Sequence, residues 1–131
     1  MKTNIKTHNE ISKDIIGAAI KIHKVLGPGL LESVYEEVLY YELTNNLGYK
    51  VQRQKAIDVV YEGIKMEKGF RADLIVENKV LIELKSVQTV IDVFKKTTLT
   101  YLRLSDLKLG LLLNFNESKL IDGITRIVNN L

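Results

Sequence analysis

The sequence predicts an α/β fold in three layers, with a mixed sheet flanked by helices. Two consecutive helical patterns occupy the first third of the chain, and short runs with strand periodicity follow from residue 49 to residue 85. A third helical pattern then precedes a continuous apolar run at 109–115. Strands joined by short turns pair antiparallel, whereas a helical crossover leads to a parallel partner, so we expect both kinds of pairing in one sheet.

The size and composition of the chain are those of one domain spanning residues 1–131. With 131 residues, 46% of them hydrophobic, the chain can bury roughly two-thirds of its unfolded surface. No cysteine is present, which excludes disulfides and zinc–thiolate sites and leaves oxygen and histidine as metal ligands. No apolar run reaches the length of a signal peptide or a membrane span, so we expect a cytoplasmic protein without membrane contact. The net charge of +3 permits nucleic-acid binding without requiring it.

Two helices should open the fold, after a flexible N-terminal segment at residues 1–8. Apolar residues recur at helical spacing from Ile11 to Leu26, and either Asn9 or Ser12 provides the N-cap. Glycine and proline at 27–29 end this helix. A second helix is expected to run from about residue 30 to residue 45.

The remaining elements are strands and one more helix. We expect an antiparallel meander with strands at 50–55, 57–61, 64–67, around Asp73 and at 80–85. A helix at about 89–104 should cross the sheet and lead to the strand at 109–115, which pairs parallel with the strand at 80–85. Residues 121–128 close the chain as an edge strand or a short irregular segment.

The run at 80–85 carries a charged pair within an otherwise apolar strand. Residues i and i+2 of a strand share a face, so Glu83 and Lys85 should project together, away from Ile82 and Leu84. Burying charge is unfavourable unless the charge is paired or holds a metal. Asp73 supplies a second carboxylate from the preceding strand. These charges predict a site rather than a solvated surface.

The turn between these two strands decides whether the carboxylates meet. A three-residue loop centred on Asn78 would pair Asp73 with Glu83 and place both on one face of the sheet. A two-residue loop at 77–78 would pair Asp73 with Ile82 and turn Glu83 to the opposite face, unless a bulge corrected the register.

An aspartate followed after a hairpin by Glu-x-Lys resembles the core motif of the PD-(D/E)xK nuclease superfamily. The resemblance implies a restriction-endonuclease-like core in which Asp73 and Glu83, with the carbonyl of Leu84, hold Mg²⁺ or, as a substitute, Mn²⁺. It also implies that Lys85 assists the attacking water. The metal neutralises the anionic phosphate in the transition state of phosphodiester hydrolysis. The expected partner is nucleic acid, with DNA favoured.

Residues 29–35, GLLESVY, are similar to the Gly-x-x-Glu-x-x-Tyr signature of the GxxExxY proteins, a small group of PD-(D/E)xK-like chains. The similarity extends through 15–39 and 110–128. The signature residues are Gly29, Glu32 and Tyr35. In the resembling family the glutamate approaches the cleft, so Glu32 is a candidate third metal carboxylate, although its place in the first helical turn also suits the helix dipole alone. Tyr35 is expected to be a core aromatic.

Other candidates surround this motif. His23 lies near the apolar stripe of the first helix and is either structural or a ligand for metal or substrate, as in some exonuclease-type relatives. The candidates for nucleic-acid contacts are Arg71, Lys95, Lys96 and Tyr101, and a solvated helix face also explains the two lysines. The resemblance predicts a glutamine four residues before Tyr101, where this chain has the shorter Thr97.

Two functions are consistent with these residues. The first is a Mg²⁺-dependent nuclease, which would reach both strands of a duplex more easily as a homodimer. The alternative is a nuclease-fold module with weak or absent catalysis that binds nucleic acid or a protein partner. Thr97 favours the alternative because it cannot reach as far toward a substrate phosphate as glutamine would.

Overall fold

The computed structural model describes residues 5–131, so residues 1–4 of the expected N-terminal segment lie outside it. Within the rest of that segment, Thr7 is the N-cap of helix α1 (His8–Leu26). Its hydroxyl accepts a hydrogen bond from the Glu10 N–H at 3.1 Å, and the Glu10 carboxylate accepts one from the Thr7 N–H at 2.9 Å. This capping box starts the helix earlier than the predicted caps Asn9 and Ser12 would.

The second predicted helix consists of two elements. Helix α2 (Glu32–Tyr41) continues into a π-helical turn, η1 (Glu42–Asn46). The Thr44 hydroxyl donates to the Tyr40 carbonyl at 2.8 Å within this turn, which is the kind of side-chain bond that disturbs a regular α-helical ladder. Among residues 5–131, none of the helices combines the length and apolarity needed to cross a bilayer.

Five strands of residues 5–131 form one mixed sheet in the order β1–β4–β5–β6–β7. The strands are β1 (Val51–Ile57), β4 (Phe70–Val76), β5 (Val80–Lys85), β6 (Leu109–Asn114) and β7 (Ile124–Val128). Strands β5 and β6 pair parallel, and the other neighbours pair antiparallel. Helix α3 (Asp92–Ser105) connects the parallel pair, and a 3₁₀ turn, η2 (Leu120–Gly123), precedes β7. The predicted mixed sheet with a helical crossover is confirmed.

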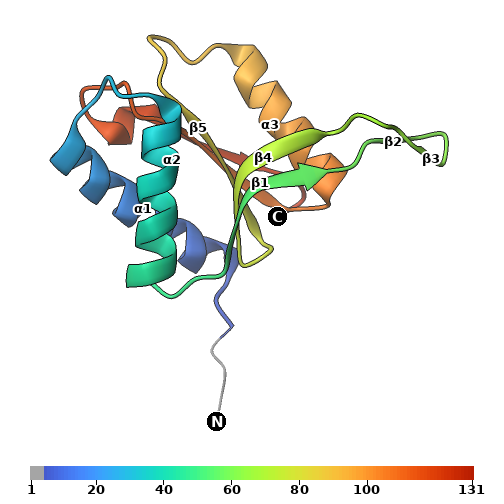
Figure 1. The fold of residues 1–131 in the computed structure, drawn as a ribbon, viewed down its shortest axis with the longest axis horizontal. Helices are drawn as coiled ribbons and strands as arrows, with labels where there is room; N and C mark the ends of the chain where they lie inside the picture. The colour runs from blue at the N-terminus through green and yellow to red at the C-terminus, as the bar shows by residue number, and fades with distance from the viewer. Residues whose placement is uncertain (1–4) are drawn as a thin grey trace.

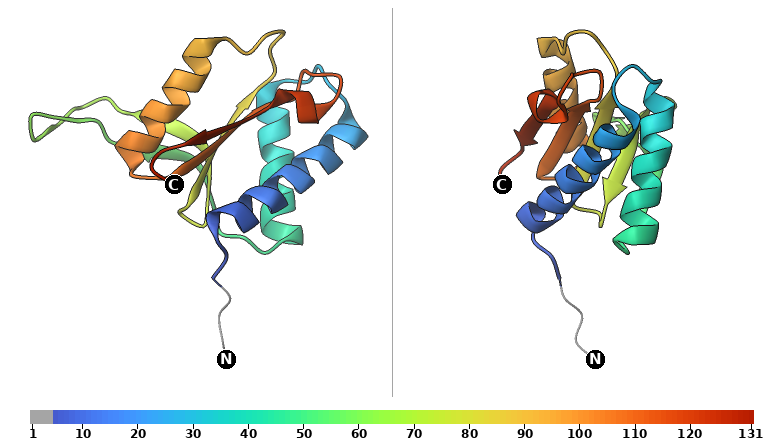
Figure 2. Two further views of the ribbon diagram at one scale, coloured as in Figure 1. Left: turned by 180° about the vertical axis from the view of Figure 1, so that it is seen from behind. Right: turned by 90° about the vertical axis from the view of Figure 1, so that its left-hand side faces the viewer.

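The sheet lies between two helical layers, as Figures 1 and 2 show. Because strand residues alternate between faces, Leu74 and Ile82 pack in the core beneath α1 and α2. Ile75 and Leu81 pack on the other face, in the cluster that includes Leu102 of α3. The odd-numbered positions of β5 therefore face α3, whereas in β4 both Ala72 and Ile75 pack on that face, so the alternation of β4 breaks around Asp73.

Strands β2 (Val60–Tyr61) and β3 (Ile64–Lys65) form a separate hairpin that projects from the body of the molecule (Figure 1). The predicted continuous meander is wrong here, because β1 pairs directly with β4. Gly69 makes this direct pairing sterically feasible, since a Cβ at that position would collide with the carbonyl oxygen of Ile57. Residues 58–69, which connect β1 to β4, therefore leave the sheet and form an arm.

Candidate active site

Asp73 and Glu83 meet where β4 and β5 stop pairing as regular strands. The ladder runs through Val76↔Val80 to Leu74↔Ile82, so residues 77–79 form the connecting loop. One step further, the Asp73 N–H donates to Oε2 of Glu83 at 2.9 Å. The Leu84 N–H donates to Oδ2 of Asp73, also at 2.9 Å. Of the two registers open to the sequence, the structure has the one that brings both carboxylates together.

Burial and like charge make this pair of carboxylates unfavourable in its ionised form. The Glu83 side chain is buried, and burial raises its pKa to about 7, with the negative charge of Asp73 adding to the rise. Burial also raises the pKa of Asp73, whereas the hydrogen bond from the Leu84 N–H opposes the rise. A nearby cation would stabilise both ionised groups.

Lys85 projects on the same side of β5 as Glu83 and supplies positive charge to the site. Its Nζ lies 4.4 Å from the centroid of the Phe94 ring on α3, a cation–π contact. The Lys85 charge lowers the pKa of Glu83 but does not outweigh the effects of burial and of Asp73. Within residues 5–131, no ion pair of 4.0 Å or less joins Lys85 to either carboxylate. The ammonium is therefore held beside the carboxylates without neutralising them.

Glu32 links the start of α2 to the end of β5. Its Oε2 accepts a hydrogen bond from the Ser86 N–H at 3.3 Å, and the Ser86 hydroxyl donates to the Leu30 carbonyl at 2.6 Å. The negative charge of Glu32 also contributes to the raised pKa of Asp73. The Glu32 carboxylate thus points toward the strand that carries Glu83 and Lys85.

Tyr35 and Gly29 hold the connection between α1 and α2 in place. The Tyr35 hydroxyl donates to the Gly27 carbonyl at 2.6 Å and accepts from the Leu30 N–H at 3.1 Å. Its fully buried ring stacks on Phe115, with centroids 4.4 Å apart. Gly29 has φ of +95°, a conformation that favours glycine. The Gly-x-x-Glu-x-x-Tyr residues therefore form one structural unit that positions Glu32.

Glu36 is a buried carboxylate near this site that the sequence analysis missed. Its Oε2 accepts from Nε of Arg53 at 2.8 Å, and its Oε1 accepts from Nε2 of Gln54 at 2.6 Å. The same Gln54 nitrogen donates to Oδ1 of Asp73 at 3.2 Å. The spacing of Glu32 and Glu36, four residues apart on one helix, was the available signal, because such residues share a face.

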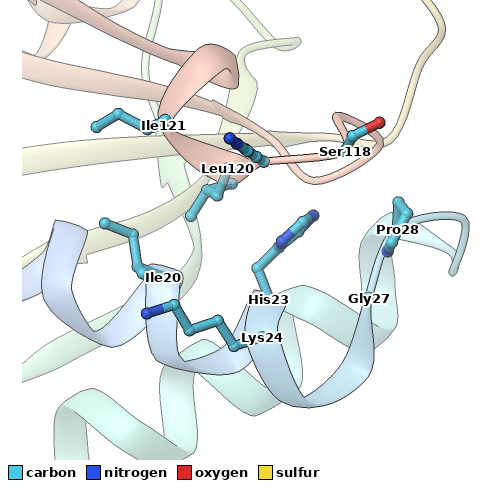
Figure 3. Close-up of a pocket in the computed structure, with 9 residues that line it drawn as sticks. Ile20, His23, Lys24, Gly27, Pro28, Ser118, Leu120 and Ile121 are labelled. Carbon is cyan, nitrogen blue, oxygen red and sulfur yellow. The ribbon is translucent and has the colours of Figure 1, made fainter.

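His23 lies on α1 and contacts the segment that precedes η2. Its Nε2 lies 2.8 Å from the Glu117 carbonyl oxygen, and because a carbonyl only accepts, Nε2 must carry the proton. The residue lines a pocket of about 450 Å³ between α1 and residues 118–121, shown in Figure 3. Asp73, Glu83 and Lys85 are not among the residues that line this pocket.

The candidate nucleic-acid contacts lie on α3 and at the base of the arm. Tyr101 stacks on Phe70 with ring centroids 3.8 Å apart, and burial followed by the charges of Glu83 and Asp73 raises the Tyr101 pKa. Lys95 and Lys96 are exposed on α3, whereas Thr97 is half-buried. Arg71 donates from Nη1 to the Gln54 carbonyl at 3.1 Å.

The donor set at the strand ends is one that a hard cation prefers. Asp73 and Glu83 offer carboxylate oxygens, and the backbone of Leu84 offers a carbonyl. Within residues 5–131, no group of three or more His, Cys, Asp or Glu side chains is close enough to enclose a metal ion. An ion at this place would therefore bind to the two carboxylates, with a carbonyl, water or a moved Glu32 side chain completing its shell.

Comparisons with known proteins agree with the fold. A family model described as "PD-(D/E)XK nuclease superfamily" matches residues 9–127. A solved structure described as "Crystal structure of SSO0001" resembles this chain with a TM-score of 0.57 and 18% identity over 94% of the chain. The present chain spans 59% of the length of that protein's chain, and the likeness concerns the fold alone. No curated protein matches the sequence.

Proposed function

Because the chain belongs to the PD-(D/E)XK nuclease superfamily, we propose that Asp73, Glu83 and Lys85 form the catalytic centre of a divalent-metal-dependent nuclease. The substrate is nucleic acid, with DNA favoured. The observation that carries this proposal is that, where β4 and β5 separate, the Asp73 N–H binds the buried Glu83 carboxylate, the Leu84 N–H binds the Asp73 carboxylate, and the charge of Asp73 adds to the raised pKa of Glu83. The narrower assignment to the GxxExxY group stays a prediction.

The residues present fit a magnesium ion. Asp73 and Glu83 would be its side-chain ligands, the Leu84 carbonyl a backbone ligand, and Glu32 a further carboxylate that binds directly or through water. Mn²⁺ suits the same oxygen donors. When bound, the metal lowers the pKa of a coordinated water and offsets charge on the phosphate. Its charge would also remove the repulsion between the two carboxylates. His23 is not part of this proposed metal site, because its Nε2 is engaged by a backbone carbonyl.

Lys85 would act on the reacting phosphate. The Phe94 ring supports its ammonium beside Glu83 without neutralising it, so the charge is available to stabilise the negative charge that develops on the phosphate oxygens. It would also orient the attacking water by donating a hydrogen bond. Both roles use the positive charge of the Lys85 ammonium.

Exposed cations near the site would bind the flanking phosphates. Lys95 and Lys96 are exposed on α3. They directly follow Phe94, whose ring contacts Lys85. Arg71 lies two residues before Asp73 on β4, and Tyr101 could stack on a base at the same end of the sheet. A homodimer would allow two such sites to engage the two strands of a duplex.

One observation favours a second function, a nuclease-fold module that binds nucleic acid or a protein with weak or absent catalysis. Thr97 is half-buried on α3 between the levels of Phe94 and Tyr101, where the family resemblance predicts glutamine. Threonine lacks the reach to bind a substrate phosphate or Lys85 from that position. The metal ligands would be retained in such a protein, but the chemical step would be slow.

A cleavage assay separates these functions. The purified chain is incubated with double-stranded DNA, single-stranded DNA or RNA in Mg²⁺, in Mn²⁺ or in chelator. We expect metal-dependent cleavage that Glu83→Gln abolishes and Glu37→Gln, which alters an exposed carboxylate on α2, leaves intact. Metal-independent binding of nucleic acid without cleavage would favour the second function. A protein that neither cleaves nor binds metal would contradict the nuclease proposal.

A further inference from the structure

We infer that Gln54 is a positioning residue that fixes the Asp73 carboxylate for metal binding, an inference that rests on the proposed role of Asp73 as a ligand. Gln54 lies on β1 directly opposite Asp73, because the flanking pairs are Arg53↔Leu74 and Lys55↔Ala72. Its side-chain nitrogen donates to Oδ1 of Asp73 at 3.2 Å. Oδ2 of the same carboxylate accepts from the Leu84 N–H at 2.9 Å. Both oxygens of Asp73 are thus held, and each keeps a lone pair for a cation.

The other proton of the Gln54 amide is bound just as firmly. It is donated to Oε1 of Glu36 at 2.6 Å, while Oε2 of Glu36 accepts from Arg53 at 2.8 Å. Glu36 is buried, with 7% of its surface exposed, so its carboxylate cannot turn toward solvent without losing these partners. The amide is therefore fixed at one end by the buried Glu36, which is paired with the exposed Arg53, and fixes Asp73 at the other.

The backbone conformation of Gln54 is unfavourable for a residue with a side chain, which suggests that the position is used to place that side chain. Its φ is +50°, in the left-handed region that a residue with a Cβ adopts only at a cost. Gln54 is exposed, so packing does not impose that conformation. In this conformation the Gln54 carbonyl accepts from Nη1 of Arg71 at 3.1 Å, and the side-chain amide binds the two carboxylates. A strained residue held by bonds to a candidate metal ligand is typical of a site that is built before its ligand arrives.

The neutral amide suits this task better than a charged group. A lysine at residue 54 would neutralise Asp73 and compete with the metal, and a glutamate would repel both Glu36 and Asp73. An amide orients Asp73 and leaves its charge unchanged. Loss of such a contact behind a metal ligand typically weakens metal binding about 10- to 100-fold.

Two variants test the inference by isothermal titration of the full chain with Mg²⁺ and with Mn²⁺. Gln54→Ala removes the amide and keeps the backbone strain, whereas Gln54→Gly removes the amide and relieves the strain. Gln52→Ala is the matched control, since Gln52 is an exposed glutamine on the same strand. We expect the Kd of both Gln54 variants to rise about 10-fold or more, and that of the control to stay unchanged. Urea unfolding in chelator verifies that each variant is folded.

The outcomes separate this inference from the nuclease proposal. If the unmodified chain binds metal and Gln54→Gly binds it equally well, Gln54 acts through the backbone alone and the inference is overturned while the proposed function stands. Equal weakening by Gln52→Ala would also overturn it, because the effect would then belong to the strand. If the unmodified chain binds neither ion, both the proposed metal site and its positioning residue are contradicted.

Discussion

At the scale of single residues, the buried carboxylate of Glu83 carries a charge that lowers stability. Oε2 of Glu83 accepts from the Asp73 N–H, and a glutamine could keep this bond through its own oxygen. Glu83→Gln would remove a buried negative charge and its repulsion with Asp73. We therefore expect the variant to melt several degrees higher than the unmodified chain at pH 8 in chelator.

The same variant should lose the stabilisation that Mg²⁺ gives to the unmodified chain, because a neutral amide is a poor ligand for a hard cation. Thermal melting with and without Mg²⁺ measures both effects. Glu37→Gln is the control, since Glu37 is exposed on α2 and should change neither value. A Glu83→Gln protein that melts lower than the unmodified chain in chelator would show that the charge is already compensated.

The raised pKa of Glu83 also predicts how stability depends on pH. The folded-state pKa is about 7, above the ordinary 4.5, so the folded protein holds this proton more tightly than the unfolded chain does. The resulting stabilisation is fully present below about pH 4.5 and is lost as pH rises through about 7. We expect the free energy of unfolding in chelator to fall by roughly 3 kcal/mol over this range.

Urea denaturation of the unmodified chain and of Glu83→Gln between pH 5 and pH 8 checks this dependence. His8, whose pKa is lowered by burial, titrates in the same window with the opposite sign, but it is common to both proteins and cancels in the difference. We expect the difference in unfolding free energy between the two proteins to change with pH. A difference that stays constant with pH would show that a group other than Glu83 causes the pH dependence.

At the scale of elements, the connection between α1 and α2 depends on the Tyr35 hydroxyl. Tyr35→Phe would keep the stack on Phe115 but leave the Gly27 carbonyl and the Leu30 N–H without their partner. We expect a loss of about 1–3 kcal/mol in the free energy of unfolding, measured in urea. Tyr41→Phe, at an exposed position on α2, is the control and should change stability by less than about 0.5 kcal/mol. Equal values for the two variants would mean that water replaces the lost contacts.

The local sequence pattern was sufficient to predict most of the helices and strands, but it did not predict how they are connected. Alternation along 80–85 predicted both the strand and the shared face of Glu83 and Lys85, because the period of a strand is set by local geometry. The start of α1 at His8 was missed because Thr7 and Glu10 form a reciprocal cap that outweighs the predicted ones. The arm was missed because Gly69 must pack against Ile57, a contact that depends on the sheet being formed.

At the scale of the whole molecule, metal binding should raise the free energy of unfolding of the entire domain. The proposed ligands come from β4, β5 and the start of α2, so an ion that bridges them binds the folded chain and not the unfolded one. At ten times its Kd, Mg²⁺ should add about 1.4 kcal/mol, a shift of a few degrees in Tm for a domain of this size. Differential scanning calorimetry over a Mg²⁺ series measures this shift, with matched ionic strength in NaCl as the control. A Tm that does not move over the Mg²⁺ series would contradict the metal site.

The sequence by itself determined the fold class, the strand that carries Glu83 and Lys85, and the presence of a second carboxylate at Asp73. These depend on periodicity and on residue chemistry, which are local. Only the tertiary structure decided the loop of residues 77–79, and with it the register that brings Asp73 to Glu83. It also decided that Gln54 and Glu36, 18 residues apart, meet beside Asp73. Such contacts join residues from a helix and two strands, and their energies depend on burial and distance, which exist only once the chain is folded.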